Sequence, residues 1–411
     1  MCIRDSNNII YTNFSCGMRA VMVQRPGIAE HCGFAINAGS RDEDEAHRGI
    51  FHFVEHTIFK GTSRRRAWNI INCMEAVGGE LNAYTTKEET MVYSTFPSGN
   101  LRRAVDLMAD ILENSSFPEA EIEREREVVA DEIDTYLDIP SEGIFDDFDD
   151  LIFAGSPLGH NILGDRESLR GFTSEVLRDY LTRFYTPGQM VFFYSGPEKP
   201  EKVERIAAGC LSTFTRPDCP RHRVTPAVLA PFDSERELST HQTHTLTGAR
   251  IGGLGSSDRF AMNLLTNILG GPGMNSRLNV ALRERRGLVY SIDAGTSLLS
   301  DTGLFTIYYG CDREDSRRCR RLVDDIMRRA AEEPVSPRGL AAAKKQYLGQ
   351  LAVASTNTEQ QILSAARSTL VRGRALNRGE VADAISAITS DDIARVASAL
   401  VPDRLSTLTF V

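Results

Sequence analysis

The sequence predicts an α+β protein made of two similar α/β-sandwich domains related by internal duplication. Two observations support this fold class. Stretches rich in β-branched and apolar residues alternate with stretches of helical periodicity along the chain. The order of these stretches in the first half then recurs in the second half.

The first half contains the pattern that is repeated. Pro26-Gly27 separates two short extended stretches and favours a hairpin between them. Gly61 and the pair Gly78-Gly79 end two helical stretches as C-terminal glycine caps do. The expected elements are strands at 19–24 and 33–38, helices at 46–59 and 64–77, a strand at 90–96, and helices at 101–112 and 119–137.

Two landmarks of the first half recur in the second half. Residues 255–258 repeat the Gly-Ser-x-Asp pattern of residues 39–42, and Pro337 repeats Pro118 at a similar offset. Any α+β chain alternates helix and strand, so the pattern alone leaves chance similarity open. We favour duplication, with a boundary in the proline-spaced stretch that begins at residue 217. The predicted domains are 1–216 and 217–411.

Composition limits the functional classes. The chain has 411 residues, of which 41% are hydrophobic, and this is enough for two or three compact domains with cores of their own. It has 47 Lys and Arg residues against 56 Asp and Glu residues, for a net charge of −9. Nucleic-acid binders need clustered surplus cations to neutralise phosphates, so we expect no nucleic-acid partner.

Cysteine spacing and hydropathy indicate the compartment. The eight cysteines form no Cys-x-x-Cys pair, so we expect no thiolate zinc site or redox motif and interpret them as free thiols. No apolar run reaches the roughly 18 to 20 residues of a membrane helix, and the start shows no signal-peptide pattern. We therefore expect a cytoplasmic protein without a membrane partner.

The residues that most clearly indicate chemistry are His52, Glu55 and His56, within the first expected helix. Residues three and four apart share one helical face, so the three polar side chains point the same way. Two imidazoles at this spacing can bind one tetrahedral zinc ion, and the carboxylate can take a proton from the water that zinc acidifies. The motif predicts a zinc site with Glu55 as general base. Chance placement of these residues on a half-buried helix is the alternative.

A zinc site with two His ligands needs a third protein ligand. The charged helix expected at 119–137 supplies candidates. Glu125 and Glu132 stand seven residues apart, so they lie two turns apart on one helical face. A Glu in such a run can equally belong to a solvated surface. Spacing by itself therefore does not choose the ligand.

Three motifs, at residues 49–62, 78–85 and 125–133, resemble the pitrilysin and insulinase family of zinc metallopeptidases. They are most similar to its short-chain branch, which includes mitochondrial processing peptidase. In that family the third ligand lies about seventy residues after the His-x-x-Glu-His motif, at the end of a Glu-x6-Glu pair. Glu132 lies 76 residues after His56. The resemblance thus implies zinc ligands at His52, His56 and Glu132, with Glu125 orienting them.

The resemblance also implies substrate-binding residues. Asn82 and Ala83 match the family's edge strand, to which a peptide adds as an extra strand through main-chain hydrogen bonds. Arg283 and Tyr290 match an Arg/Tyr pair whose Tyr hydroxyl donates to the carbonyl oxygen as negative charge develops. Without the resemblance, the same residues would be interpreted as part of a turn, a surface Arg and a strand Tyr.

The resemblance finally implies a zinc-dependent endopeptidase that hydrolyses peptides or unfolded segments inside a clamshell of four homologous domains. A two-domain chain is then expected to pair with a second chain as a homodimer, with the zinc of one chain facing Arg283 and Tyr290 of the other. The main alternative is a non-catalytic subunit of the family that holds peptides or a partner chain. A metal-dependent hydrolase of other substrates is a further alternative. The required residue types at the ligand and base positions favour the enzyme.

Overall fold

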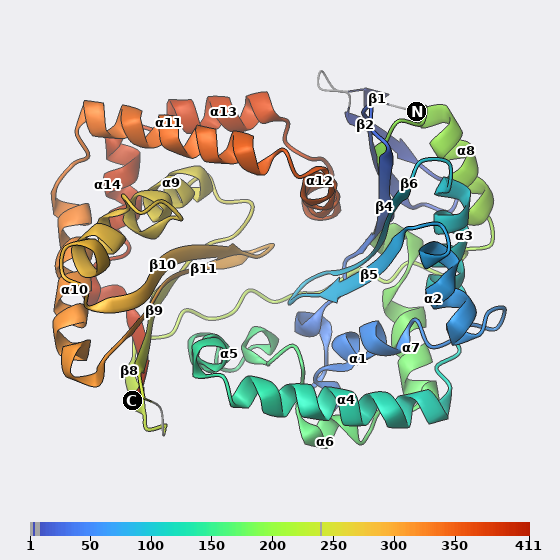
Figure 1. Cartoon of the computed structure of the whole chain (residues 1–411), viewed down its shortest axis with the longest axis horizontal. Helices are drawn as coiled ribbons and strands as arrows, with labels where there is room; N and C mark the ends of the chain where they lie inside the picture. Colours follow the sequence, from blue (N-terminus) through green and yellow to red (C-terminus); the bar gives the residue numbers. More distant parts are fainter. Residues whose placement is uncertain (1–2, 5–8, 239–240) are drawn as a thin grey trace. The chain divides into compact units, whose positions relative to one another are not determined.

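The computed structural model describes residues 3–4, 9–238 and 241–411. They form two compact units, each of which draws segments from both halves of the chain (Figure 1). The first unit comprises residues 1–134, 160–223 and 355–377. The second unit comprises residues 135–159, 224–354 and 378–411.

These units differ from the predicted domains 1–216 and 217–411 in two respects. The chain passes from the first unit to the second after Arg223. In addition, segments 135–159 and 355–377 each belong to the unit that is formed mainly by the other half of the chain. The covering of the two sheets explains this exchange of segments, as described below.

A mixed seven-stranded sheet forms the centre of the first unit, with neighbouring strands in the order β1-β2-β3-β7-β4-β6-β5. Strands β3 and β7 run parallel, and the other neighbours run antiparallel. Strand β5 lies at one edge of the sheet. The strands are β1 (Ile3–Arg4), β2 (Ile9–Asn13), β3 (Arg19–Gln24), β4 (Ala29–Ile36), β5 (Glu80–Thr85), β6 (Thr90–Pro97) and β7 (Met190–Gly196).

The helices of the first half pack mainly on one face of this sheet, where a large cluster of buried apolar side chains forms the core. Expected elements at 90–96, 101–112 and 119–137 occur as β6, α3 and α4. The helices are α1 (Ile50–Thr57), α2 (Ala67–Glu75), α3 (Leu101–Asn114), α4 (Glu119–Leu137), α6 (Arg166–Leu169), α7 (Ser174–Phe184) and α8 (Pro200–Cys210).

The predicted hairpin between the first two extended stretches is wrong. Strand β7 lies between β3 and β4, parallel to the former and antiparallel to the latter. Every residue of β7 is buried, as expected for a central strand of a sheet covered on both faces. The local Pro-Gly signal carries no information about a strand more than 150 residues away in the chain.

Helix α1, which carries the His-x-x-Glu-His motif, is shorter than the predicted range 46–59. Residues Glu45–His47 form a 3-10 turn, and the α-helix begins at Ile50. Gly49 separates the two because its backbone is left-handed, with a φ of 83°. A Cβ atom at this position would lie 2.4 Å from the carbonyl oxygen of Leu163, so only glycine fits without a shift.

The second unit contains a five-stranded sheet with the strand order β10-β11-β9-β12-β8. Its strands are β8 (Asp233–Arg236), β9 (Thr243–Gly252), β10 (Val289–Leu298), β11 (Thr302–Cys311) and β12 (Ser406–Phe410). Its helices are α5 (Pro140–Ile152), α9 (Arg259–Gly270), α10 (Ser316–Glu332), α11 (Pro337–Ala354), α13 (Arg378–Ala387) and α14 (Ser390–Ser398), with a π-helical turn at Asn279–Glu284.

The two sheets share one topology, which confirms the predicted duplication. From its other edge the second sheet has the order β8-β12-β9-β11-β10, and the first sheet contains the order β3-β7-β4-β6-β5. In both sheets the first of these pairs is parallel and the remaining pairs are antiparallel. Strands at the same place in the two orders are therefore counterparts.

One face of each sheet is covered by a helix from the other half of the chain. In the first unit, helix α12 (Thr358–Arg372) packs on β7 and β4, with Ile362 in one buried cluster with Phe193. In the second unit, α5 packs on β12 and β9, with Phe148 in one buried cluster with Leu246. The two helices cover counterpart strands, so the halves of the chain exchange equivalent helices.

The cysteines and the helices can be compared with the expectations of free thiols and of no membrane-spanning helix. All the cysteines that the structure describes are free thiols, and Cys2 lies outside the described residues. Within the described ranges, no helix combines the length and the apolar character that crossing a bilayer requires.

The exchanged helix makes a testable contribution to stability. Replacing Ile362, whose side chain is fully buried, by Ala should lower the free energy of unfolding by about 2–5 kcal/mol, because the cavity left beneath α12 cannot close completely. Urea unfolding followed by circular dichroism measures the loss. Ser364→Ala, on the exposed face of the same helix, is the matched control and should change stability little. Equal stabilities of the two variants would contradict the assigned packing.

Candidate metal centre

Helix α1 presents two imidazoles on one face. It has only eight residues, and its apolar side chains Phe53 and Val54 are fully buried in the core. His52 and His56 are one helical turn apart, and their ring centroids lie 4.6 Å apart in an edge-on arrangement. The buried apolar side of the helix thus fixes the direction in which both rings point.

The third predicted ligand lies opposite these rings on α4. The Oε2 atom of Glu132 is 3.7 Å from Nε2 of His52 and 3.4 Å from Nε2 of His56. One ligand atom from each of the three residues lies within 4.8 Å of the others. Two ligands bound to one zinc ion at about 2.1 Å with tetrahedral angles are about 3.4 Å apart, so the three side chains fit a zinc ion.

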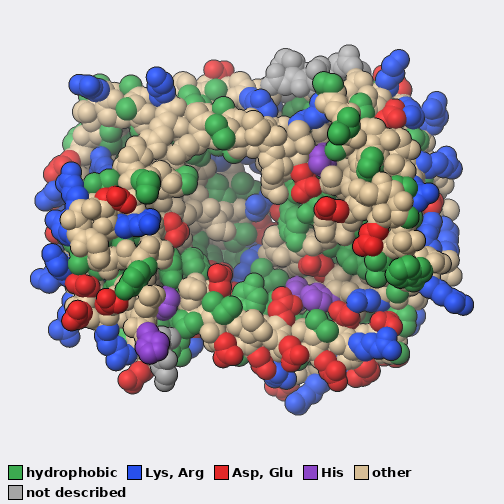
Figure 2. Space-filling model, in the orientation of Figure 1, with side chains coloured by type: hydrophobic (Ala, Val, Ile, Leu, Met, Phe, Trp, Pro, Cys, Tyr) green, Lys and Arg blue, Asp and Glu red, His purple; other side chains and the backbone are tan. Residues whose placement is uncertain are grey.

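Burial keeps His52 in the form that binds metals. The residue is only 8% exposed, and burial together with the neighbouring His56 lowers its pKa to about 3. The imidazole is therefore neutral at ordinary pH, and a neutral nitrogen can donate its lone pair to a metal. Figure 2 shows His side chains over α1, beside Asp and Glu side chains that gather along α4.

A second carboxylate orients His56. The Nδ1 atom of His56 is 3.2 Å from Oε2 of Glu125, which is buried, and this leaves Nε2 to face Glu132. The other Glu125 oxygen lies 2.6 Å from the ammonium group of Lys60. Such a partner fixes both the tautomer and the direction of a ligating imidazole. The structure therefore places Glu125 where the resemblance implies an orienting residue.

Glu55 is half-buried beside the edge strand β5. Burial raises the pKa of its carboxyl group, while hydrogen bonds from the hydroxyl and the backbone N–H of Thr85 act in the opposite direction, and the net pKa is raised. A carboxyl group with a raised pKa is better matched to proton exchange near neutral pH. The structure places Glu55 on the same helix as the two His residues, as the predicted role of general base requires.

The free edge of β5 can accept an extended chain. Thr86 donates its N–H to Glu89. Directly after β6, Ser98 donates its N–H to Ile28 on the other side, so the hydrogen bonds of β5 and β4 to β6 alternate in a known register. In this register Asn82 pairs with β6, whereas the N–H and C=O groups of Ala83 point away from it. Of the two predicted substrate-binding residues, Ala83 therefore offers backbone groups to a bound peptide. Asn82 itself is half-buried.

Arg283 and Tyr290 belong to the second unit. A π-helical turn carries Arg283, and the carbonyl oxygen of Arg283 accepts the N–H of Gly287, which turns the chain back toward β10. Tyr290 is 60% exposed at the start of β10, and its hydroxyl donates to Asp312, whose negative charge raises the pKa of the phenol. Both side chains are exposed and belong to one turn of the chain.

Sequence reasoning missed two residues of the first unit that touch the site. Lys60 follows His56 by four residues and lies just past the end of α1, and this spacing is the local signal that it reaches Glu125 on the same side as His56. Thr85 lies inside one of the family-like stretches, but its hydrogen bonds to Glu55 depend on the register of β5, which no local pattern reveals.

Comparisons with known proteins agree with this geometry. The sequence model described as insulinase (peptidase family M16) matches residues 21–166, and that of the peptidase M16 inactive domain matches residues 171–347. A relative named as an uncharacterized zinc protease of Mycobacterium tuberculosis is 31% identical over 398 residues, which are 96% of this chain and 91% of the relative. The chain belongs to the insulinase family of peptidases, family M16.

Other M16 relatives and structures are similar over comparable lengths. An uncharacterized zinc protease of Bacillus subtilis is 28% identical over 92% of both chains. The crystal structure of a protease from Helicobacter pylori matches 98% of this chain and 99% of its own with a TM-score of 0.90 at 18% identity. The peptidase M16 inactive domain from Pseudomonas fluorescens matches 98% of both chains with a TM-score of 0.91 at 19% identity. The two structures show that the fold is shared.

The second M16 family model is described as an inactive domain, and the second unit lacks the His-x-x-Glu-His motif at the place equivalent to α1. Helix α9 follows β9, the counterpart of β4, as α1 follows β4, and α9 contains neither His nor Glu. The duplicated copy therefore lacks the motif that supplies two ligands and a carboxylate in the first unit. In this M16 chain the candidate metal ligands come from α1 and α4.

The ligand set can be tested by metal content. Glu132→Gln should lose most bound zinc on dialysis, because a neutral amide is a poor ligand for zinc. Glu127→Gln is the matched control, since Glu127 lies on an exposed face of the same helix, and it should keep one zinc ion per chain. Atomic absorption on folded, dialysed protein gives the ratio. Equal zinc content in the two variants would exclude Glu132 as a ligand.

Proposed function

We propose that this M16 chain is a zinc-dependent metalloendopeptidase that hydrolyses peptide bonds of peptides or unfolded segments. The observation that carries the proposal is the meeting of His52, His56 and Glu132 at ligand distances next to the half-buried carboxyl group of Glu55. The names of the relatives as zinc proteases support the reaction class.

Each group of the site has a distinct task in this proposal. Zinc, when bound, would supply Lewis acidity that lowers the pKa of a water molecule and polarises a carbonyl group. Glu55 accepts the proton of the attacking water and passes it to the leaving amine, for which a raised pKa is suited. Ala83 on β5 holds the backbone of the peptide, and Glu125 keeps His56 in place.

Main-chain recognition explains the proposed substrate class. A peptide that adds to the free edge of β5 is held by hydrogen bonds that every residue type except proline can make. Folded proteins have few unpaired extended segments to offer, so short peptides and unfolded segments are the expected substrates. We further propose that the protein works in the cytoplasm.

The proposal includes a homodimer with shared sites. Arg283 and Tyr290 are exposed on the second unit. The Tyr290 hydroxyl donates to Asp312 in this chain, and it would exchange that acceptor for an oxygen on which negative charge develops. We propose that these two residues serve the zinc centre of a second copy of the chain. In this proposal one sequence encodes both the zinc ligands and the Arg283 and Tyr290 pair that serves the zinc centre of the other copy.

The base can be tested separately from the metal. Glu55→Gln should abolish cleavage of a mixed pool of unstructured peptides while it retains zinc, because Gln cannot accept the proton of water. Mass spectrometry of the pool reads out cleavage by wild type and variant at equal zinc content, and Glu127→Gln is expected to cleave as wild type does. Zinc-loaded wild type that cleaves none of the peptides would instead favour the non-catalytic subunit, and a partner chain would then be sought.

Site sharing predicts complementation between two inactive variants. His52→Ala and Tyr290→Phe should each be nearly inactive alone, and a mixture that is dissociated and reassembled should regain part of the activity. Some mixed dimers then combine one intact zinc centre with one intact Tyr290. The recovered rate should depend on the mixing ratio and be highest near equal amounts. Reassembled mixtures that stay as inactive as each parent would show that sites are not shared.

A further inference from the structure

The start of helix α1 lacks the usual capping side chain. Gly49 occupies the N-cap position, and no side-chain hydrogen bond comes from it. Ser, Thr, Asp or Asn normally fill this position and satisfy the first free N–H groups of a helix. His52 lies in the first turn of a helix of only eight residues, so any fraying there moves a metal ligand.

Glu43 supplies the missing cap from six residues upstream. Its Oε2 accepts the N–H of Gly49 at 2.7 Å, and its Oε1 accepts the N–H of Phe51 at 3.1 Å. The residue is only 5% exposed. A carboxylate at the N-terminus of a helix also interacts favourably with the partial positive charge of that end. Each oxygen of Glu43 thus accepts one of the free N–H groups at the start of the helix.

The two imidazoles differ in how they are held. Glu125 binds the second nitrogen of His56. The second nitrogen of His52, Nδ1, is buried and has no hydrogen-bond partner among the described residues. The direction of the His52 ring therefore depends on its own backbone and on packing, and that backbone is the turn that Glu43 holds.

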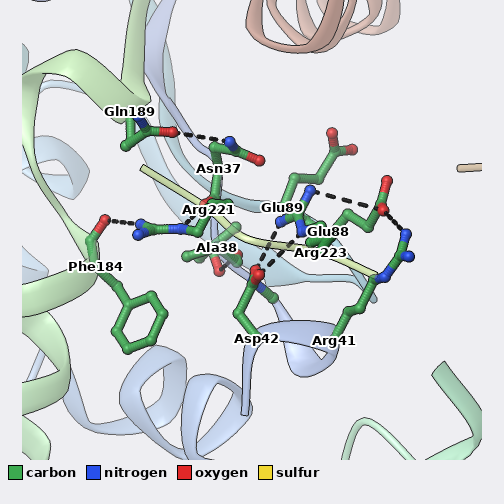
Figure 3. A network of polar contacts seen from close by, with 12 residues as sticks. Asn37, Ala38, Arg41, Asp42, Glu88, Glu89, Phe184, Gln189, Arg221 and Arg223 are labelled. Atoms are coloured by element: carbon green, nitrogen blue, oxygen red, sulfur yellow. Dashed lines mark hydrogen bonds and ion pairs between the residues drawn. The ribbon is translucent and has the colours of Figure 1, made fainter. Parts of the chain in front are cut away.

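Buried ion pairs fix the segment that carries Glu43 (Figure 3). Arg41 donates to Glu88 at 2.6 Å, and both side chains are almost fully buried. Arg223 makes two hydrogen bonds to the carboxylate of Asp42, at 2.9 and 2.6 Å. Paired donors of this kind fix position as well as charge. The residues directly before Glu43 therefore cannot shift without breaking buried contacts.

We propose that Glu43 is a positioning residue of the metal centre, whose carboxylate holds the first turn of α1 and thereby the Nε2 atom of His52 opposite Glu132. The proposal rests on the proposed function only in that zinc is the metal. It adds a residue that touches neither metal nor substrate and lies outside the His-x-x-Glu-His motif.

The test compares Glu43→Gln with Glu45→Gln, an exposed neighbour on the same segment. A Gln side chain keeps the size of Glu43 but turns an NH2 group toward one of the two N–H donors. Zinc affinity is measured by chelator competition at pH 8.5, above the pKa of about 8 to which burial raises Glu43. We expect zinc to bind about 10- to 100-fold more weakly in Glu43→Gln and unchanged in the control.

A spectrum separates positioning from general destabilisation. With cobalt in place of zinc, the visible absorption bands report ligand geometry, and they should shift in Glu43→Gln at temperatures where the variant is fully folded. Glu43→Asp keeps the charge but reaches only one N–H group, so it should give an intermediate affinity. A folded Glu43→Gln with unchanged zinc affinity and cobalt spectrum would overturn the proposal. Failure of both variants to fold would also overturn it, since Glu43 would then serve the fold and not the metal.

The outcomes also distinguish this inference from the proposed function. Absence of zinc binding by the wild-type protein would contradict both the role of Glu43 and the peptidase proposal. Tight zinc binding by wild type without cleavage of any peptide would remove the peptidase proposal alone, and the comparison of Glu43→Gln with Glu45→Gln would still decide the role of Glu43.

Discussion

The site depends on one geometric constraint: side chains from two helices far apart in sequence must bring three ligand atoms within 4.8 Å of one another. Helix α1 meets this constraint through its buried apolar side, which fixes its two imidazoles. Helix α4 meets it by burying Val129 and Ile122 next to the face that carries Glu125 and Glu132. A shift of about 1 Å in either helix is a large fraction of a metal–ligand bond. The hydrophobic core of the first unit therefore sets the metal geometry.

Strand β5 contacts the proposed base and also offers the free edge for the proposed substrate. Thr85 turns its N–H toward Glu55, and in the alternating register of β5 the next outward-facing residue is Ala83. A peptide bound at Ala83 would therefore be held one step along the strand from the carboxyl group that we propose as the base. No loop therefore separates the proposed peptide-binding residue Ala83 from Thr85, which contacts Glu55 on α1.

Local patterns predicted the parts of the fold that depend on local physics. The long helix at 119–137 appears with those bounds because its composition favours helix throughout. The start of α1 was placed four residues early because the left-handed backbone of Gly49 is imposed by contact with residues 163 and 164, which lie far along the chain. The hairpin failed for a similar reason, since β7 separates its two strands. The roles of Lys60 and Thr85 also depend on tertiary contacts, and the spacing of Lys60 was the one usable local signal.

The exchange of α5 and α12 between the two units has a consequence for synthesis on the ribosome. The sheet of the first unit is complete once β7 has emerged, but one of its faces stays bare until residues 358–372 have been made. Apolar side chains such as Val191 and Phe193 are then open to water or to chaperones while residues 197–357 are being made. The unit that carries the candidate metal ligands is therefore completed only when a helix near the end of the sequence has been made.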